Sequence, residues 1–371
     1  MRIALVHDWI TGMRGGERVL SRVCRLFPHA HLHTLIHTPG VADDTIERMH
    51  IVATGLSRLP GVARYYRWLL PVMPAVISRV DLRDYELVIS LSHCVAKGAS
   101  VDPTAVHACY CFTPMRYIWA DVGDDGRGKL GELGLRLARP YLRRWDLRTA
   151  AGVDVFMSNS ANVADRIRRC YGRHAEVVHS PVDLDFYTPD PSASRENWYL
   201  VVSALTPYKR VADAIEACGH TRRPLKVIGS GPQLRQLASL AARFTGIDLL
   251  GWRSDDEVRW HYRRCRAVLM PQEEDFGLVP LEAMACGAPV VAYGAGGALE
   301  TVRDGETGVL YTPQGWRHLA SSMDRLERLG LGQHAGTLRS SVASFSPSVF
   351  DQRFVETLRS ACHVKGRTLP C

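Results

Sequence analysis

Two glutamates that could bind a polar ligand stand eight positions apart in the C-terminal half of the chain. Glu274 belongs to a segment that contains a glycine and predicts a loop, and Glu282 lies in an apolar run that predicts a short helix. The N-terminus of a helix presents free N–H groups and the positive end of the helix dipole, which favour an anionic or hydroxyl-rich ligand. The spacing therefore predicts one acid at the mouth of this helix and the other about one turn inside it.

The residues around the two acids indicate the elements that hold them. Pro280 suits the first turn of a helix, because its missing N–H would have no partner there. Gly287 suits the left-handed residue that ends a helix, and Pro289 cannot extend it. Residues 290–292, Val-Val-Ala, predict a buried strand. The sequence therefore predicts a loop, a short helix and a strand in succession.

This stretch resembles the E-x7-E signature of the family 4 retaining glycosyltransferases, which have the GT-B fold. The resemblance rests on the letters E-D-F-G-L-V-P-L-E followed by A-M-A-C-G-A-P-V-V, because a bare pair of glutamates at this spacing is common. In that family the first Glu and the amides after it hold the donor sugar, and the second Glu holds the ribose of the sugar nucleotide. Carried over, these roles fall on Glu274, Phe276, Gly277, Leu278 and Glu282. Asp275 stands where family members often have Gly, so its side chain would affect the choice of sugar. The alternative is an ordinary loop, helix and strand with two surface acids.

Two cations follow the strand expected at 199–203. Lys209 and Arg210 stand where they could neutralise the charge of a departing diphosphate. The family usually has Arg where this chain has Ala204, followed by Lys, so the chain keeps the Lys and lacks the Arg. Arg210 or a cation from the first domain would have to compensate. The alternative is a solvated basic turn.

Pairs of glycines follow two other expected strands. Gly15 and Gly16 are expected in the first loop, and Gly229 and Gly231 in a second, where the absence of a Cβ lets the backbone approach a phosphate closely. In the family the first loop lies against the donor diphosphate and sugar, and the second lies near the nucleotide. Plain tight turns are the alternative. Neither loop spells G-x-G-x-x-G, which disfavours a nicotinamide cofactor.

The first half of the chain departs from the family at one notable position. Residues 112–117, Phe-Thr-Pro-Met-Arg-Tyr, resemble the family's H-T-P-x-R-Y stretch, whose His binds the donor sugar in many members. Phe112 takes the place of that His. Arg116 is kept and could meet a phosphate or an acceptor group, or could be an ordinary surface arginine. The alternating His29, His31 and His33 are attributed to a half-exposed strand, and no metal site is expected.

Strands alternate with helices along the whole chain, which predicts parallel sheets covered on both faces. A length of 371 residues suits two domains. The fold class is α/β, and the resemblance implies the GT-B architecture of two Rossmann-like domains facing a central cleft. We expect an acceptor-side domain at 1–186, a linker at 187–197 and a nucleotide-sugar donor domain at 198–345. In the GT-B pattern, residues 346–371 form a helix that crosses back to the first domain.

Composition narrows the class of partner. The formal net charge of +8 favours anionic partners without choosing among them. The ten cysteines form no C-x-x-C pair, which indicates reduced thiols in a cytosolic protein. The start of the chain does not read as a signal peptide, and no apolar run has the length of a membrane span. No nucleic-acid-binding motif accompanies the basic residues, so a nucleic-acid partner is not expected.

Two arginine-rich segments indicate a possible membrane surface. Residues 58–79 contain four arginines and no acid, interleaved with aromatic residues and leucines. Residues 127–148 contain seven cations against two acids. Such mixtures suit an interfacial helix on anionic lipid, although a helix with a core face and a solvated basic face would look similar.

Together these patterns predict a retaining glycosyltransferase that moves a sugar from a nucleoside diphosphate donor to a glycan or lipid-linked hydroxyl. Its resemblance to bacterial mannosyltransferases of polysaccharide assembly implies mannose and GDP-mannose, with no cofactor required. The residues expected to carry catalysis are Glu274, Lys209 and Arg210. The residues expected to bind the donor are Gly15, Gly16, Arg116, Gly229, Gly231, Phe276, Gly277, Leu278 and Glu282. A cytoplasmic protein, possibly peripheral on the cytoplasmic face of the membrane, is expected. A GT-B scaffold that binds sugar nucleotide or glycan without turnover, and an arginine-rich nucleic-acid binder, are the alternatives.

Overall fold

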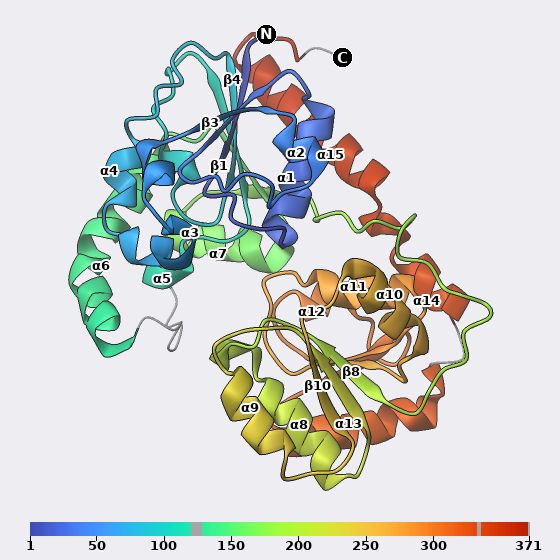
Figure 1. The fold of residues 1–371 in the computed structure, drawn as a ribbon. Coiled ribbons are helices and arrows are strands. Elements are labelled where there is room, and N and C mark those ends of the chain that lie inside the picture. The colour runs from blue at the N-terminus through green and yellow to red at the C-terminus, as the bar shows by residue number, and fades with distance from the viewer. Residues whose placement is uncertain (120–127, 332–334, 370–371) are drawn as a thin grey trace. The chain divides into compact units, whose positions relative to one another are not determined.

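A computed structural model describes residues 1–119, 128–331 and 335–369. These residues form two compact units, each built on a parallel sheet covered by helices (Figure 1). The first unit comprises the described residues up to 180 and those from 350 onward, and the second begins at 181 and ends at 349. The segment expected as a linker, 187–197, lies within the second unit.

The first unit has a seven-stranded sheet in the order β3-β2-β1-β4-β5-β6-β7, and all its neighbouring strands are parallel. Its strands are β1 (Ile3–His7), β2 (His31–Thr34), β3 (His50–Ala53), β4 (Leu87–Ser92), β5 (Val106–Cys111), β6 (Val155–Ser158) and β7 (Ala175–Val177). Successive residues of β1 point to opposite faces. Leu5 packs into a core on one face of the sheet, and Ala4 and Val6 pack into a core on the other.

Helices cover both faces of this sheet. The α-helices of the first unit are α1 (Gly15–Leu26), α2 (Asp44–Glu47), α3 (Val62–Tyr65), α4 (Met73–Ile77), α5 (Arg116–Trp119), α6 (Gly128–Ala151), α7 (Ala161–Tyr171) and α15 (Pro347–Val364). Three short 3₁₀ helices join them: η1 (Gly55–Arg58), η2 (Tyr66–Leu69) and η3 (Ala96–Gly98).

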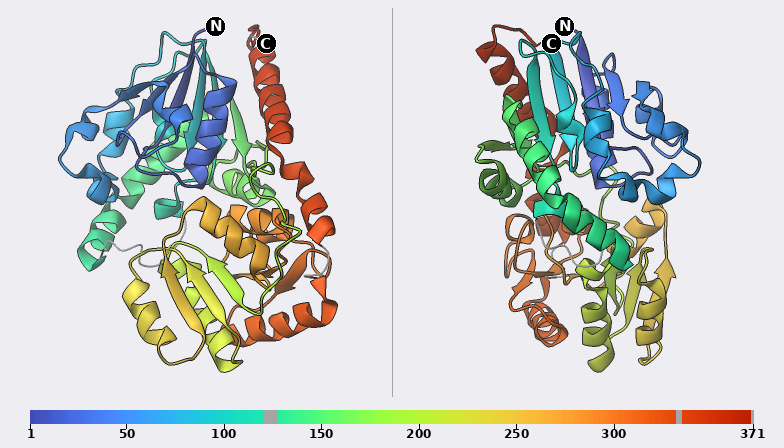
Figure 2. Two further views of the ribbon diagram at one scale, coloured as in Figure 1. Left: turned by 45° about the vertical axis from the view of Figure 1, so that its right-hand side comes forward. Right: turned by 90° about the vertical axis from the view of Figure 1, so that its left-hand side faces the viewer.

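The last helix, α15, belongs to the first unit although the chain reaches it only after leaving the second (Figure 2). Phe350, Phe354 and Leu358 recur at helical spacing and are buried in the same core as Tyr110 of β5. Burial of three such side chains contributes roughly 1.5–3 kcal/mol each. Arg22 of α1 also donates to Asp351 at 2.7 Å. The prediction of a terminal helix that returns to the first domain is therefore confirmed.

The second unit has a six-stranded parallel sheet in the order β10-β9-β8-β11-β12-β13. Its strands are β8 (Tyr199–Val202), β9 (Leu225–Ile228), β10 (Ile247–Gly251), β11 (Val268–Met270), β12 (Val290–Tyr293) and β13 (Gly308–Tyr311). Its helices are η4 (Pro207–Lys209), α8 (Val211–His220), α9 (Leu234–Ala241), α10 (Asp255–Arg264), α11 (Leu278–Ala285), α12 (Ala298–Thr301), α13 (Trp316–Leu329), α14 (Ala335–Ser341) and η6 (Ala343–Phe345). The predicted α/β class with two Rossmann-like domains is confirmed.

Two local expectations were wrong. Gly15 and Gly16 do not lie in a loop but are the first two residues of α1, because Glu17 accepts a hydrogen bond from the Arg14 amide at 3.1 Å and starts the helix there. Residues 58–79 do not form one helix but the short pieces η1, α3, η2 and α4, since the prolines and Gly61 within them interrupt regular helix. Arg127, part of the second basic segment, falls outside the described residues. No helix in the described parts of the chain is long and apolar enough to cross a membrane.

Candidate functional site

The second sheet has one position where the order of successive strands reverses. From β8 the strands β9 and β10 follow on one side, whereas β11, β12 and β13 follow on the other. The loops after β8 and β11 therefore diverge at the carboxyl ends of two neighbouring strands. In open parallel sheets this is where ligands bind.

A cation and an acid meet across this position. Lys209 ends η4, which follows β8, and Glu274 lies in the loop after β11. Their side chains form an ion pair, and Gln272 donates a second hydrogen bond to the same Glu274 oxygen at 2.9 Å. Both charged side chains keep about a seventh of their surface exposed, 14% and 16%. The pair is therefore within reach of a ligand, and a ligand could exchange places with either partner.

The backbone fixes the direction in which the acid loop enters α11. The Gly297 amide donates to the Glu274 carbonyl at 2.8 Å, and a Cβ on Gly297 would overlap the Phe276 backbone. Phe276 itself is buried in the apolar core. Gly277 has φ +89°, a conformation that favours glycine, and the helix begins at Leu278. The N-cap residue of α11, Gly277, has no side chain that could cap the helix, and the positive end of the helix dipole lies beside the acid loop.

Glu282 occupies a different environment inside α11. It is 8% exposed and accepts a hydrogen bond from the Tyr262 hydroxyl of α10 at 3.0 Å. Burial and then the neighbouring Glu282 carboxylate raise the pKa of Tyr262, so this hydroxyl stays protonated and donates. The structure thus holds Glu282 in one orientation, and Tyr262 is a partner that the sequence pattern did not indicate.

Arg210 is committed to a local contact. Its guanidinium pairs with Asp213 in the first turn of α8 at 2.8 Å. Its backbone has φ +51°, an unusual value for a residue with a side chain, at the junction of η4 and α8. The side chain is 38% exposed, so it can still contribute positive charge to the loop after β8.

Gly229 and Gly231 are needed for backbone packing. A Cβ on Gly229 would overlap the carbonyl of Ser203, and a Cβ on Gly231 would overlap the Leu205 backbone. The Leu205 amide donates to the Ser230 carbonyl at 2.9 Å. The two glycines therefore bring the loop after β9 against the loop that carries Lys209.

The first-unit candidates lie near the ends of β1 and β5. A Cβ on Gly16 would meet the Phe112 ring at 3.7 Å, which is ordinary contact. Arg116 begins α5 and is half-buried. Phe112 packs edge-on against His7, with ring centroids 6.4 Å apart. Gly15, Gly16 and Arg116 therefore remain candidates for anion binding, now placed at helix starts.

The structure brings Lys209 and Glu274 together, with residues 276–278 directly after the acid. It ties Glu282 to Tyr262 and Arg210 to Asp213 instead. Gln272 was missed, and its position two residues before Glu274 at the end of a strand was the signal that could have found it. Within the described residues, no group of three or more His, Cys, Asp or Glu could hold a metal ion.

The cysteines play no visible part in this site. The nine described cysteines are free, and Cys24, Cys218 and Cys286 are buried as expected. Burial raises the pKa of Cys286 to about 12, which keeps the thiol neutral.

Comparisons with known proteins found similarity over most of the second unit. Residues 189–336 match the family described as glycosyl transferases group 1. A D-inositol 3-phosphate glycosyltransferase of Geodermatophilus obscurus is 36% identical over 44% of this chain and 43% of its own length. A GDP-mannose-dependent alpha-(1-6)-phosphatidylinositol monomannoside mannosyltransferase of Mycolicibacterium smegmatis is 33% identical over 47% of this chain and 52% of its own. The chain thus spans about half the length of these curated relatives.

The fold of the whole chain also has a solved counterpart. The HepE protein of Anabaena in complex with UDP-glucose superposes with a TM-score of 0.71, at 20% identity, covering 97% of this chain and 100% of that one. This similarity establishes the GT-B fold, in agreement with the resemblance seen in the sequence.

Proposed function

Because residues 189–336 belong to the glycosyl transferases group 1 family, we propose that this protein is a retaining glycosyltransferase. It transfers a hexose from a nucleoside diphosphate sugar to a hydroxyl of a glycan or lipid-linked acceptor. The observation that carries the proposal is the ion pair of Lys209 and Glu274 where β8 and β11 diverge, next to the start of α11.

Each residue has a role that follows from its chemistry. Glu274, with the backbone amides of Phe276, Gly277 and Leu278, orients the hydroxyls of the sugar. Lys209 moves from the carboxylate to the diphosphate and stabilises its charge as the bond to the sugar breaks.

Glu282, held by Tyr262, accepts hydrogen bonds from the ribose. Arg210 adds positive charge beside the diphosphate although it is paired with Asp213. Gly229 and Gly231 bring a further stretch of backbone close to the nucleotide, and Gly15, Gly16 and Arg116 contact the donor from the first unit.

The chemistry needs no dedicated base in the protein. The acceptor oxygen bonds to the anomeric carbon on the face from which the diphosphate leaves. The proton of the acceptor hydroxyl passes to an oxygen of the leaving phosphate. The configuration at the anomeric carbon is therefore retained, and no cofactor takes part.

GDP-mannose is our choice of donor. It agrees with the resemblance to bacterial mannosyltransferases and with the GDP-mannose-dependent relative in Mycolicibacterium smegmatis. The Anabaena structure binds UDP-glucose instead, and the donor panel below therefore includes both nucleotides.

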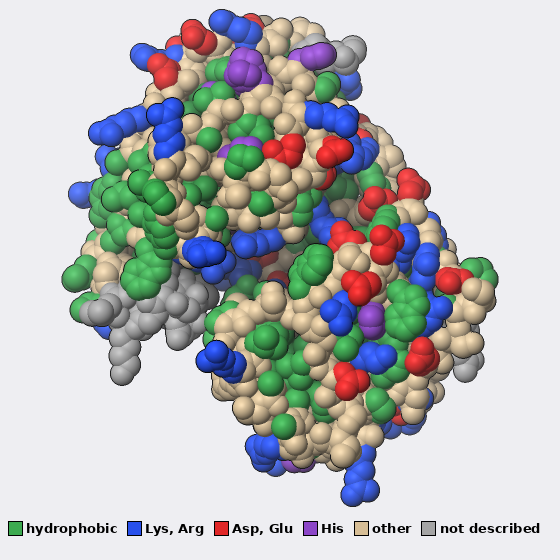
Figure 3. Space-filling model, viewed as in Figure 1, with side chains coloured by type: hydrophobic (Ala, Val, Ile, Leu, Met, Phe, Trp, Pro, Cys, Tyr) green, Lys and Arg blue, Asp and Glu red, His purple; other side chains and the backbone are tan. Residues whose placement is uncertain are grey.

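We also propose that the first unit docks on anionic lipid from the cytoplasmic side. Trp68 and Val72 near α4, and Leu137 and Tyr141 on α6, are about half-exposed or more, at 53%, 49%, 77% and 48%. Five arginines lie close to them in the sequence: Arg64, Arg67, Arg136, Arg144 and Arg148. Figure 3 shows hydrophobic side chains with basic ones around them on the side of the first unit that carries α4 and α6. Such a mixture suits the interface of a bilayer that carries negative charge.

The proposal is tested with the purified full chain and a panel of sugar nucleotides. Release of nucleoside diphosphate is measured with GDP-mannose, UDP-glucose and UDP-galactose, with and without a mannoside acceptor. We expect turnover with GDP-mannose and an anomeric product of unchanged configuration by NMR. We expect Glu282→Gln to weaken donor affinity about tenfold, and unchanged affinity would contradict its role. Donor binding without any turnover would favour the non-catalytic alternative.

A further inference from the structure

The first sheet has its own position where the order of successive strands reverses. From β1 the strands β2 and β3 follow on one side and β4 to β7 on the other, so the loops after β1 and β4 diverge. Val6 pairs with Ser90 and His7 with Leu91. Asp8 is the first residue after β1 and His93 the first after β4, so they meet at the carboxyl ends of two neighbouring strands, where parallel sheets bind ligands.

The carboxylate of Asp8 is fully buried, and both of its oxygens accept hydrogen bonds. Its two oxygens accept hydrogen bonds from four successive backbone amides, those of residues 93–96, at 2.6–3.0 Å. One of these oxygens also lies 3.1 Å from Nδ1 of His93. Because an ionised carboxylate accepts only, Nδ1 carries the proton and donates to it. The other ring nitrogen of a neutral His93, Nε2, is then an acceptor with a free lone pair.

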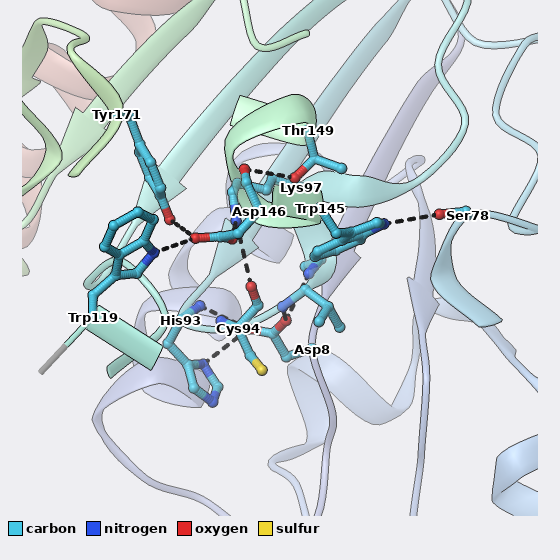
Figure 4. A network of polar contacts seen from close by, with 12 residues as sticks. Asp8, Ser78, His93, Cys94, Lys97, Trp119, Trp145, Asp146, Thr149 and Tyr171 are labelled. Atoms are coloured by element: carbon cyan, nitrogen blue, oxygen red, sulfur yellow. Dashed lines mark hydrogen bonds and ion pairs between the residues drawn. The ribbon is translucent and has the colours of Figure 1, made fainter. Parts of the chain in front are cut away.

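The loop that carries His93 is held rigidly from its other end (Figure 4). Lys97 is buried and forms an ion pair with Asp146 of α6. The same carboxylate accepts hydrogen bonds from Trp119 at 2.7 Å and from Tyr171 at 2.8 Å. Burial alone would lower the pKa of Lys97, but the Asp146 carboxylate raises it above its ordinary value, so Lys97 stays charged.

Close packing removes the remaining freedom of this loop. A Cβ on Gly98 would overlap the Trp145 ring, so only glycine lets η3 lie against α6. Asp8 holds residues 93–96 from one side and Asp146 holds Lys97 from the other. His93 is therefore a preorganised side chain on a rigid loop, which is what a binding residue needs.

The imidazole is the exposed end of this arrangement. The His93 side chain is 29% exposed, whereas that of Asp8 has no exposed surface. Its ring packs edge-on against Phe112, with centroids 6.4 Å apart, and against Trp9, with centroids 4.6 Å apart. A partly exposed imidazole framed by aromatic rings suits a carbohydrate, which offers both hydroxyls and C–H faces.

Burial, together with the charges around it, favours the neutral form of His93. Burial lowers its pKa most, and the cations of Arg14, Arg116 and Arg67 lower it further, although Asp8 opposes them. His7 also faces the ring, with centroids 6.1 Å apart, and its own pKa is lowered by burial. The ring is therefore an acceptor at neutral pH.

We propose that Nε2 of His93 accepts a hydrogen bond from a carbohydrate hydroxyl, with Asp8 as the residue that positions the ring. This rests on the proposed glycosyltransferase function and deepens it. The ring of Phe112 lies beside that of His93, with centroids 6.4 Å apart, and gives an apolar surface next to the nitrogen. The hydroxyl belongs either to the donor sugar or to the acceptor sugar.

The test compares four full-length proteins: wild type, His93→Ala, His93→Gln and the control His174→Ala. His174 is an exposed histidine of the same unit, with 82% of its side chain in solvent. Each protein is assayed for donor hydrolysis without acceptor and for transfer with acceptor, as kcat and KM for each substrate across pH 5–9. Thermal unfolding verifies that the variants are folded.

We expect His93→Ala to lower transfer about tenfold, since one neutral hydrogen bond is lost. His174→Ala should behave as wild type. Loss of donor hydrolysis as well as transfer assigns the hydroxyl to the donor sugar, whereas loss of transfer alone assigns it to the acceptor. The wild-type rate should fall on acidification with an apparent pKa below 6.5, and this acid limb should disappear in His93→Gln.

Unchanged kinetics in His93→Ala, beside an active wild type, would overturn this inference and leave the proposed function intact. An acid limb that persists in His93→Gln would also overturn it, because another group would then be titrating. A wild type without any turnover would overturn the proposed function, and this inference with it.

Discussion

The two sheets place an acid at the same topological position and use it differently. In the first unit Asp8 follows β1 and faces His93, which follows β4. In the second unit Glu274 follows β11 and faces Lys209, which lies beyond β8. Both acids thus lie at the carboxyl ends of two neighbouring strands whose following loops diverge to opposite sides of the sheet.

The difference lies in what holds each carboxylate. Asp8 is bound by four backbone amides and cannot move without breaking the loop around it. Among the described residues, the Glu274 carboxylate contacts the side chains of Lys209 and Gln272, and it keeps some exposed surface. Asp8 therefore fixes the loop around it and orients His93, whereas Glu274 can exchange its protein partners for a ligand.

The largest expected effect is the difference between the two acids in their contribution to the free energy of unfolding. Asp8→Ala leaves several buried amides without an acceptor and should lower the free energy of unfolding by about 3–5 kcal/mol. Glu274→Ala removes a partly exposed acid and should cost about 1 kcal/mol. Urea denaturation of both variants measures the gap. Equal losses would show that the two acids do not differ in this way.

Acid should destabilise the first unit at a higher pH than the second. Burial lowers the pKa of His33 and His107 in the first unit to about 4. Between pH 6.5 and 4 the unfolded chain binds these protons and the folded unit does not, so stability is lost as the pH falls, by about 3 kcal/mol per fully buried histidine.

In the second unit, burial by itself would raise the pKa of Glu327. Its hydrogen bonds with Tyr199 and Arg223 outweigh burial and lower this pKa to about 2. Its contribution is present above pH 4.5 and is lost only as the pH falls towards 2. Hydrogen exchange of the two units at pH 7, 5.5 and 4 measures the order of loss. His107→Gln should flatten the response of the first unit, and a second unit that opens first would refute the assignment.

Loss of the exchangeable cation should affect activity rather than folding. Lys209→Met should lower kcat about a hundredfold, which corresponds to about 2.7 kcal/mol, because the departing diphosphate loses the positive charge that we propose for Lys209. Arg235 on α9 is exposed in the same unit, and Arg235→Met serves as the matched control. Steady-state kinetics with the active donor decide the matter, and equal activity of the two variants would remove Lys209 from the mechanism.

The smallest expected effect concerns the surfaces of the two units. Trp68 of the first unit and Trp252 of the second are both exposed, at 53% and 73%. Trp68→Ser should weaken binding to vesicles of phosphatidylglycerol and phosphatidylcholine about tenfold, whereas Trp252→Ser should not. Vesicle flotation measures this, with pure phosphatidylcholine as the uncharged reference. Equal binding by both variants would place the membrane contact elsewhere or exclude it.

The sequence predicted the parts of the fold that carry strong local signals. The helix between Pro280 and Gly287 and the strand after it are as expected, because a proline, a glycine and a buried apolar run specify them. Strands β3 and β7 were not predicted, since they are short and lie at the sheet edges. Their strand conformation comes from pairing with a neighbour rather than from their own pattern.

The contacts within the site were predictable only between residues that are contiguous in the sequence. Glu274 and residues 276–278 form one motif, whereas the ion pair to Lys209 joins segments 65 residues apart. Asp8 and the amide of His93 are 85 residues apart and meet only through the register of β1 and β4. A single sequence carries no register for parallel strands, so such pairs become visible only in the folded chain.

The return of α15 to the first unit makes residues 181–349 an insertion within that unit. During synthesis, the apolar face around Tyr110 must therefore wait for Phe350 and Phe354, which leave the ribosome some 240 residues later. The inserted unit can complete its own core in the meantime. The half of the protein made first is thus the half that finishes folding last, and a nascent chain halted before α15 would expose it to chaperones.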